Sequence, residues 1–316
     1  MHISITRATT DEYMKEQFLI PAIRCCEKQV NCEEQVNQHS VHISGRDEQI
    51  FIKSKNPIHQ TKYTLSDFQF EKCLHQGGAS VGGRVYKAIH KQSQLCVVLK
   101  MFIVPDASSR IKVLIEREIS IHSQLDHPHI IQLYAAFKEG LYIVLVLEYA
   151  EQGDLLPALH WNLTEHELKY NIVKPLILTL QHLHNNGIVH RDIKVENIFL
   201  DKEGIIRLGD FGLAIDRTIE VPKTPRVGTS LFMAPEVSQS KEKSAQHISS
   251  YNEKVDVYSL GRMILEFIQH NKSTQITQPF KDFIAYCLIL DPNLRPSCSE
   301  LLDHTWFNAM NIEYRI

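Results

Sequence analysis

The chain carries two short motifs that decide its fold, His190-Arg191-Asp192-Ile193-Lys194-Val195-Glu196-Asn197 and Asp210-Phe211-Gly212. The first motif supplies the Asp192 carboxylate, which can orient a hydroxyl group and receive its proton. Asn197 and Asp210 supply a carboxamide and a second carboxylate, the hard oxygen donors that hold magnesium against phosphate. The pair of motifs therefore predicts a site for phosphoryl transfer.

Size and composition exclude several other classes of protein. The chain has 316 residues and a formal net charge of −3, which favours neither nucleic acid nor an anionic membrane as a partner. The most apolar run, residues 141–147, is too short to span a bilayer and indicates a buried strand. No secretory signal pattern opens the sequence. We therefore expect the seven cysteines to be thiols in a reducing cytoplasm or nucleus.

The order of the predicted elements indicates an α+β fold with a small β-rich lobe followed by a larger helical lobe. Residues 1–65 are polar and form an N-terminal extension that is partly helical or disordered, with a possible helix over 11–35. Alternating patterns predict strands at 68–74, 83–89, 95–102, 130–137 and 141–147. Helical periodicity predicts helices at 110–125, 165–185 and 255–270. We place the folded domain at 66–310, with an N-lobe at 66–148, a C-lobe at 153–310 and a cleft between them.

From about residue 67 to residue 307 the chain resembles the eukaryotic protein kinases of the Ser/Thr type. The resemblance rests on the two opening motifs, on Val97-Val98-Leu99-Lys100, on Leu147-Glu148-Tyr149-Ala150 and on the segment 228–236, which ends in Ala-Pro-Glu. Lys194 marks the Ser/Thr type. The strings around Glu118, the hinge and the catalytic loop look most like the Aurora kinases. The resemblance implies a bilobal protein-kinase fold, ATP and Mg²⁺ as cofactors, and protein substrates.

The resemblance also implies the residues of an ATP site. They comprise a glycine-rich loop (Gly78, Ser80, Gly83), a sandwich around adenine (Val85, Val98, Phe199), a charge clamp (Lys100, Glu118), a hinge that binds through its backbone (Glu148, Ala150) and a ribose contact (Asp154). Ser80 stands where the family has a second glycine. Glu116 is the rival of Glu118 for Lys100, and Asp154 can equally cap the next helix.

The catalytic residues implied by the resemblance are Asp192, Lys194 and Lys100, with Asn197 and Asp210 as ligands of Mg²⁺. Lys194 would offset charge on the phosphoryl group during transfer. Thr229 would hydrogen-bond Asp192 and Lys194 and favour a Ser or Thr acceptor. Glu196 and Asp154 would attract basic residues upstream of that acceptor.

Three further implied roles concern regulation and support. Arg191 would pair with a phosphate on Thr224, with Thr218 as the rival phosphorylation site. Asp256 would brace the catalytic loop from a buried helix. Arg295 would form a buried ion pair with Glu236.

Two hypotheses from different classes follow. In the first the chain is an active Ser/Thr protein kinase, and Lys100, Asp192, Asn197 and Asp210 favour it because all four are present. In the second it is a pseudokinase scaffold, favoured by Ser80 and by the short stretch between Gly261 and Arg295. A small-molecule kinase is a third reading, which the peptide-gripping segment disfavours. Residues 1–65 are a candidate contact for a regulatory partner, and we expect no nucleic acid or membrane partner.

Overall fold

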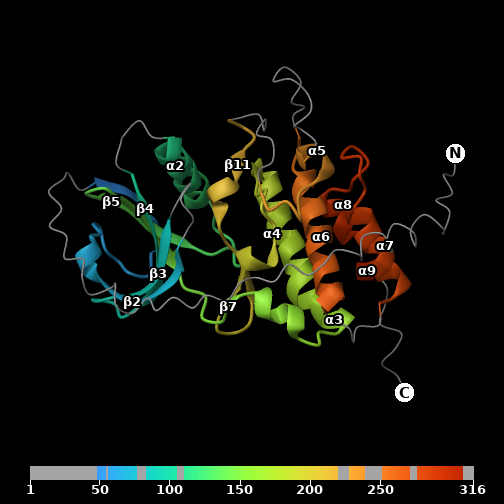
Figure 1. The fold of residues 1–316 in the computed structure, drawn as a ribbon, viewed down its shortest axis with the longest axis horizontal. Coiled ribbons are helices and arrows are strands. Elements are labelled where there is room, and N and C mark those ends of the chain that lie inside the picture. Colours follow the sequence, from blue (N-terminus) through green and yellow to red (C-terminus); the bar gives the residue numbers. More distant parts are fainter. Residues whose placement is uncertain are drawn as a thin grey trace.

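The N-lobe is built on one antiparallel sheet, with a helical C-lobe beside it (Figure 1). The computed structural model describes residues 48–54, 56–76, 83–104, 110–219, 228–238, 251–270 and 276–308. The sheet has six strands in the order β1-β5-β6-β4-β3-β2. They are β1 (Glu48–Ile52), β2 (Phe68–Gln76), β3 (Arg84–His90), β4 (Cys96–Ile103), β5 (Leu133–Glu139) and β6 (Tyr142–Glu148). The predicted strands are thereby confirmed, each within a few residues.

One helix, α2 (Arg110–Ser123), packs on the N-lobe sheet (Figure 1). Ile111, Ile115 and Ile119 recur every four residues, so they form one apolar stripe along the helix. The stripe contacts a group of side chains that we call the α2 cluster. Its buried members are Phe102, Val104, Ile115, Ile119, Leu133, Ala136, Ile143 and Leu145, and Phe51, Ile111 and Leu147 pack against them.

The folded lobe begins earlier than the boundary at residue 66 that we expected. β1 pairs antiparallel with β5, and Ile58 and Tyr63, from the same stretch, are buried in the core. Tyr63 stacks on Phe68 and Phe137. The sequence pattern did not predict this strand because the stretch contains few apolar residues. Its backbone hydrogen bonds are made to β5, far along the chain. Residues 1–47, with the helix predicted at 11–35, lie outside the described part.

The C-lobe is helical and is arranged around α6 (Lys254–His270) (Figure 1). The other helices are α3 (Glu165–Glu167), α4 (Lys174–Asn185), α5 (Pro235–Ser238), α7 (Gln278–Cys287), α8 (Cys298–Leu302) and α9 (Thr305–Asn308). A π-helical segment, Leu168–Val173, joins α3 to α4 within the helix predicted at 165–185. There the N–H of Lys174 donates to the carbonyl of Lys169, just before Pro175, which has no N–H to donate.

Short strand pairs at the lobe boundary hold the two opening motifs. β8 (Ile188–Val189) pairs with β11 (Ile215–Asp216), and β9 (Ile198–Leu200) lies between β7 (Gly153–Asp154) and β10 (Ile206–Leu208). Residues 190–197 therefore connect β8 to β9, and residues 210–212 connect β10 to β11. Within the described residues, no helix combines the length and the apolar character needed to cross a membrane.

Candidate active site

The backbone of the loop 190–197 is held by hydrogen bonds to the side chain of Asp256 in α6. This carboxylate is fully buried and accepts hydrogen bonds from the backbone N–H of His190 at 2.9 Å and of Arg191 at 2.8 Å. Arg191 has a φ of 70°, a left-handed conformation that the two bonds help to hold. The predicted brace by Asp256 is confirmed.

A buried histidine, which the sequence pattern did not single out, completes this brace. His184 of α4 has its Nε2 at 2.9 Å from Oδ2 of Asp256 and its Nδ1 at 3.5 Å from Sγ of Cys298. Burial favours the neutral imidazole, but the hydrogen bonds with Asp256 and Cys298 outweigh burial and raise the pKa of His184 to about 10. His184 is therefore a cation at neutral pH and balances the buried carboxylate.

Asp192 lies at the centre of a network of hydrogen-bond donors. Its Oδ1 accepts from the backbone N–H and the hydroxyl of Thr229, both at 3.0 Å. Its Oδ2 accepts from Nδ2 of Asn197 at 2.9 Å and lies 2.8 Å from Nζ of Lys194. Lys194 also donates to the hydroxyl of Thr229 at 2.9 Å, so the predicted contacts of Thr229 with both residues are confirmed.

Gly228 explains why Thr229 can approach so closely. It has a φ of +106°, and a Cβ at this position would lie 2.5 Å from the carbonyl oxygen of Arg191. Real Cβ atoms do not approach backbone oxygens to that distance, so only glycine fits here.

Lys100 of β4 is clamped between two carboxylates. Its Nζ lies 2.7 Å from Oε1 of Glu118 and 2.8 Å from Oδ1 of Asp210. Burial disfavours the ammonium form, but both carboxylates outweigh burial and raise the pKa of Lys100 above its ordinary range. The charge of Lys100 in turn holds the pKa of Asp210 well below the usual value. Glu116 lies 3.5 Å from Lys112, so Glu118 rather than Glu116 is the partner of Lys100, as predicted.

A column of rings connects α2 to the loop 190–197. Phe211 is fully buried, with its ring centroid 4.6 Å from that of His122 and 5.1 Å from that of His190. Nε2 of His122 is 2.7 Å from the carbonyl of Ile131, whereas its buried Nδ1 has no hydrogen-bond partner among the described residues. Burial lowers the pKa of His122 to about 4, so this histidine is neutral. The position of α2 and the conformation around Asp210 are thereby linked.

Asn197 and Asp210 fit the donor set that magnesium needs. Nδ2 of Asn197 donates to Asp192, which turns its amide oxygen away from that residue. The N–H of Gly209 donates to the carbonyl of Asn197 at 2.9 Å, so the backbones that carry Asn197 and Asp210 are adjacent. The side chain of Asp210 is 47% exposed and therefore accessible to an ion. Two oxygen ligands are enough, because Mg²⁺ keeps waters and binds phosphate oxygens.

A face of the sheet beside Lys100 carries the residues predicted to contact adenine. Val85 of β3 lies opposite Lys100 in the ladder, and Val98 lies two residues before Lys100, so all three share one face. Phe199 of β9 lies opposite Asp154 of β7 in the neighbouring C-lobe sheet. The Asp154 carboxylate accepts the N–H of Leu156 at 3.0 Å, but the N-cap of the short helix that follows is Leu155, so Asp154 is not its capping residue.

The side chain of Glu148, in the predicted hinge, makes its contacts on the opposite side of the sheet from Lys100. The Glu148 carboxylate accepts the N–H of Gln132 at 3.0 Å and lies 3.5 Å from Arg207. Ala150 is buried in the connection to β7. Of the glycine-rich loop, Gly83 is described, whereas Gly78 and Ser80 lie outside the described residues.

The sequence model of the protein kinase domain family matches residues 71–275. The chain belongs to the protein kinase family. It is 31% identical to the cytokinesis protein sepH of Emericella nidulans over 265 residues, which are 77% of this chain and 19% of that protein. It is 32% identical to the serine/threonine-protein kinase MST20 of Pyricularia oryzae over 256 residues, 73% of this chain and 27% of the relative.

The serine/threonine-protein kinase pakA of Talaromyces marneffei is 30% identical over 260 residues, 74% of this chain and 39% of the relative. The chain thus spans well under half of the length of each of these relatives. The bilobal kinase fold predicted from the motifs is confirmed by the family match and by the two lobes. The Aurora-like subgroup stays a prediction.

The kinase segment that ends in Ala-Pro-Glu is anchored by a buried ion pair. Nη1 of Arg295 lies 2.7 Å from Oε1 of Glu236, and Nη2 lies 3.0 Å from Oε2. Arg295 is fully buried, and its two parallel bonds fix the segment geometrically. The predicted pair is confirmed.

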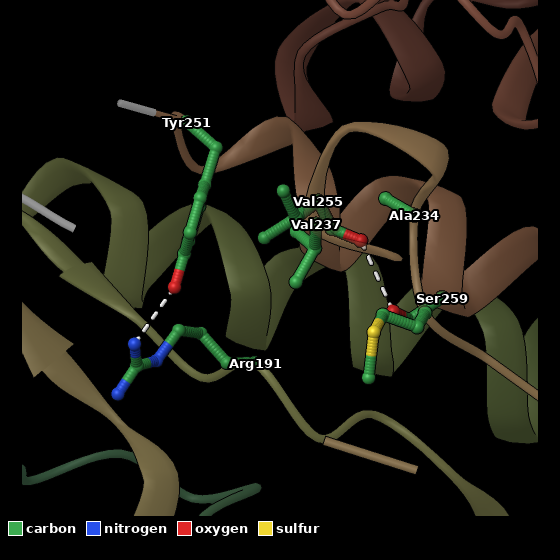
Figure 2. A pocket seen from close by; sticks show the side chains of 7 residues that line it. Arg191, Ala234, Val237, Tyr251, Val255 and Ser259 are labelled. Atoms are coloured by element: carbon green, nitrogen blue, oxygen red, sulfur yellow. Dashed lines mark hydrogen bonds between the residues drawn. The ribbon is translucent and has the colours of Figure 1, made fainter. Parts of the chain in front are cut away.

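Arg191 of the kinase loop reaches a pocket beneath the same segment (Figure 2). Its Nε donates to the carbonyl of Leu213 at 2.6 Å and its Nη1 to the hydroxyl of Tyr251 at 2.7 Å. The pocket is lined by Arg191, Met233, Ala234, Val237, Tyr251, Val255 and Ser259. Tyr251 had not been predicted as a partner. Thr224 lies outside the described residues, whereas the hydroxyl of its rival Thr218 donates to Asp216 at 2.6 Å.

A second acidic residue near the kinase loop was missed from sequence. Glu266 lies on α6, and its Oε2 is buried with no hydrogen-bond partner among the described residues. Burial raises the pKa of Glu266, and the charge of the exposed Glu196 raises it further. The sequence pattern around Glu266 gives no sign of its burial, because a glutamate in a helix is usually exposed to solvent.

Proposed function

We propose that the chain is a protein serine/threonine kinase, which transfers the γ-phosphoryl group of ATP to Ser or Thr hydroxyls of proteins. The observation that carries the proposal is the network around Asp192, in which Thr229, Lys194 and Asn197 all contact one carboxylate. The completed Lys100–Glu118 pair supports it.

The nucleotide site follows the face already described. The adenine lies between Val85 and Val98 of the sheet and Phe199 of the C-lobe. The backbone groups of Glu148 and Ala150 are the proposed contacts of the purine, whereas the Glu148 side chain is engaged with Gln132 and Arg207. Asp154 stays a proposed ribose contact, and Gly78, Ser80 and Gly83 stay the proposed phosphate loop.

The phosphates are held by Lys100, whose ammonium is kept charged by Glu118 and Asp210. Asn197 and Asp210 would hold Mg²⁺, which would neutralise phosphate charge when bound. Both residues offer oxygen donors on adjacent stretches of backbone.

In the transfer step the acceptor hydroxyl oxygen forms a bond to the γ-phosphorus, and the bond from that phosphorus to the β–γ bridging oxygen breaks. ADP leaves with the electron pair of that bond, and the hydroxyl proton passes to the Asp192 carboxylate. Lys194, 2.8 Å from that carboxylate, offsets negative charge on the group in transit. The hydroxyl of Thr229 positions a Ser or Thr acceptor beside Asp192.

The alternative, a pseudokinase scaffold, predicts that at least one of these contacts is missing. Lys100 instead donates to Asp210, and Asn197 donates to Asp192, in two hydrogen bonds of ordinary length. This arrangement supports turnover rather than nucleotide binding alone.

The proposed substrate preference rests on Glu196 and Asp154, as predicted, and on Glu266 in addition. Glu196 is exposed in the same loop as Asp192, and its negative charge raises the pKa of the nearby Glu266 carboxyl. A basic substrate residue upstream of the acceptor would pair with Glu196 and Glu266. It would also give the buried Oε2 of Glu266 a hydrogen-bond donor. A peptide array that shows no preference for Arg or Lys would remove this part of the proposal.

Regulation is proposed on Arg191, which would exchange its bond with Tyr251 for a phosphate on Thr224. Residues 1–65 remain a proposed contact for a regulatory partner. The protein is proposed to act in the reducing cytoplasm or nucleus, consistent with the buried thiols Cys287 and Cys298, which form no disulfide.

The deciding experiment is a phosphate-transfer assay with the wild-type chain and with Asp192→Asn, with Mg²⁺ or Mn²⁺ and generic protein substrates. Asp303→Asn, at an exposed residue that follows α8, is the matched control, and we expect it to keep wild-type activity. We expect transfer by the wild-type chain and its loss in Asp192→Asn. Equal, background-level transfer by both would rule out the kinase function.

A further inference from the structure

The strand β1 places a phenylalanine against the apolar cluster in which the helix that carries Glu118 is packed. In the pairing of β1 with β5, Phe51 lies opposite Ala136 and Ile52 lies opposite Ala135. Successive side chains of a strand point to opposite faces of the sheet. Phe51 packs against the α2 cluster, whereas Ile52 packs against the core on the other face.

The α2 cluster sets the rotation of α2 about its axis. Ile115 and Ile119 are buried in it, and Glu118 projects from the adjoining position toward Lys100 at 2.7 Å. A loss of apolar contact beneath Ile115 and Ile119 would allow α2 to rotate or move outward. Lys100 would then lose Glu118 as a partner.

A second contact is made by Lys53, the residue directly after β1, near the end of α2. The ammonium of Lys53 is 3.1 Å from Oδ1 of Asp126, just beyond the helix, and it also donates to the side-chain oxygen of Gln132. Asp126 is mostly exposed, so this ion pair alone contributes little. Together with Phe51, however, it ties β1 and the residue after it to the α2 cluster and to the connection between α2 and β5.

The strand itself is held firmly by the residues that follow it. Nδ2 of Asn56 donates to the hydroxyl of Tyr63 at 2.6 Å and to the carbonyl of Tyr134 at 3.0 Å. Tyr63 is 2% exposed. The N–H of Leu65 donates to Glu139 at 2.6 Å. β1 is thus fastened to the sheet at several points beyond its own ladder.

We propose that β1 is a built-in support for α2 and that Phe51 is a positioning residue for the Lys100–Glu118 pair. The proposal rests on the proposed kinase function, because that pair matters through its contact with ATP. Phe51 touches neither substrate nor nucleotide and acts through the α2 cluster. The chain's own N-terminal segment therefore sets the position of the helix on which phosphate binding depends.

The test compares Phe51→Ala with Ile52→Ala. Both changes truncate a partly buried side chain of β1, but only the first removes a contact with the α2 cluster. We expect Phe51→Ala to lower kcat/KM for ATP about tenfold, the effect of depleting the paired state to about a tenth. We expect Ile52→Ala to stay close to wild type and Phe51→Leu to recover most of the loss. Equal losses in Phe51→Ala and Ile52→Ala would overturn the proposal.

A double-mutant cycle with Glu118→Gln shows whether Phe51 acts through the pair. Because Glu118→Gln already removes the ion pair, we expect Phe51→Ala to add little to it. Additive losses would contradict the proposal, since they would mean that Phe51 affects activity by another route. Should Phe51→Ala not fold, Phe51→Val, a smaller truncation with high strand propensity, replaces it in the same comparisons.

Hydrogen exchange of the α2 amides measures how firmly the helix is held, and it does not require catalytic activity. We expect exchange in α2 to be about tenfold faster in Phe51→Ala than in Ile52→Ala. Unchanged α2 exchange would overturn the proposal even if the wild-type chain transfers phosphate. An inactive wild-type chain with faster α2 exchange in Phe51→Ala would instead contradict the kinase function alone.

Discussion

The hydroxyl of Tyr251 accepts a hydrogen bond from Nη1 of Arg191 at 2.7 Å, in the pocket beneath the Ala-Pro-Glu segment (Figure 2). Tyr251 lies three residues before α6, the helix that carries Asp256, and Arg191 immediately precedes Asp192. The bond therefore connects the segment before α6 to the loop 190–197 through two side chains. Asp256 connects α6 to the same loop through backbone N–H groups of the loop.

We predict that Tyr251→Phe lowers the free energy of unfolding by about 1–2 kcal/mol, because a buried guanidinium loses an acceptor. Arg191 is only 8% exposed, so water cannot readily replace the hydroxyl. Denaturant unfolding measures the change. Tyr170→Phe, at a half-buried tyrosine of the π-helical segment, serves as the control, and an equal effect in both would refute the prediction.

We predict that Glu118→Gln lowers kcat/KM for ATP by about a hundredfold, because the Lys100 ammonium loses the charge that orients it. Glu116→Gln removes the same charge from the same helix but leaves Lys100 paired, so we expect wild-type kinetics. Steady-state kinetics with varied ATP decide. Comparable losses in the two variants would show that the net charge of α2, and not the ion pair, is what matters.

We predict that Gly228→Ala lowers kcat by about a hundredfold, because the added methyl group displaces Thr229 from Asp192. The new Cβ would lie 2.5 Å from the carbonyl of Arg191. Gly204→Ala is the matched control: Gly204 also has a positive φ, of +77°, but its Cβ would meet Gln152 only at 4.0 Å. We expect that control to lose about 1 kcal/mol of stability and little activity. Normal kcat in Gly228→Ala would contradict the role of Thr229.

We predict that stability falls as the pH rises from about 6.5 toward 10, and that His184→Gln abolishes this fall. The pKa of His184 is raised to about 10 in the folded protein, above the value of about 6.5 in an unfolded chain. The folded state therefore binds this proton more tightly, and the stabilisation is complete below pH 6.5. It is lost progressively as the pH approaches 10, with a magnitude on the order of a few kcal/mol. Urea unfolding at pH 6, 8 and 9.5 tests the slope, and identical slopes in wild type and variant would disprove it.

The chemistry of the two opening motifs predicted Asp192, Asn197 and Asp210 as residues of a phosphoryl-transfer site. Lys100, Lys194, Glu118 and Arg295 were placed by the resemblance to the protein kinases, because spacing alone gives them no role. These contacts hold because each motif carries its own backbone conformation, as the left-handed φ of Arg191 and Asp210 shows.

Long-range partners could not be predicted in the same way. The contact of His184 with Asp256 joins α4 to α6, and the pairing of β1 with β5 joins residues more than eighty positions apart. A strand of five residues with Glu48 and Gln49 at its start gives little hydrophobic signal. Its register depends on the edge of a sheet formed elsewhere in the chain. Glu266 was missed for a related reason, because its burial depends on neighbours that its own helix does not specify.

The position of β1 has a consequence for how the domain is produced in isolation. The family match begins at residue 71, and a fragment cut there would lack the strand that covers β5. The backbone N–H and C=O groups of β5 would then be open to pairing with a second molecule. A fragment that starts before residue 48 keeps that edge covered, so its solubility and its tendency to self-associate should differ from those of the shorter fragment.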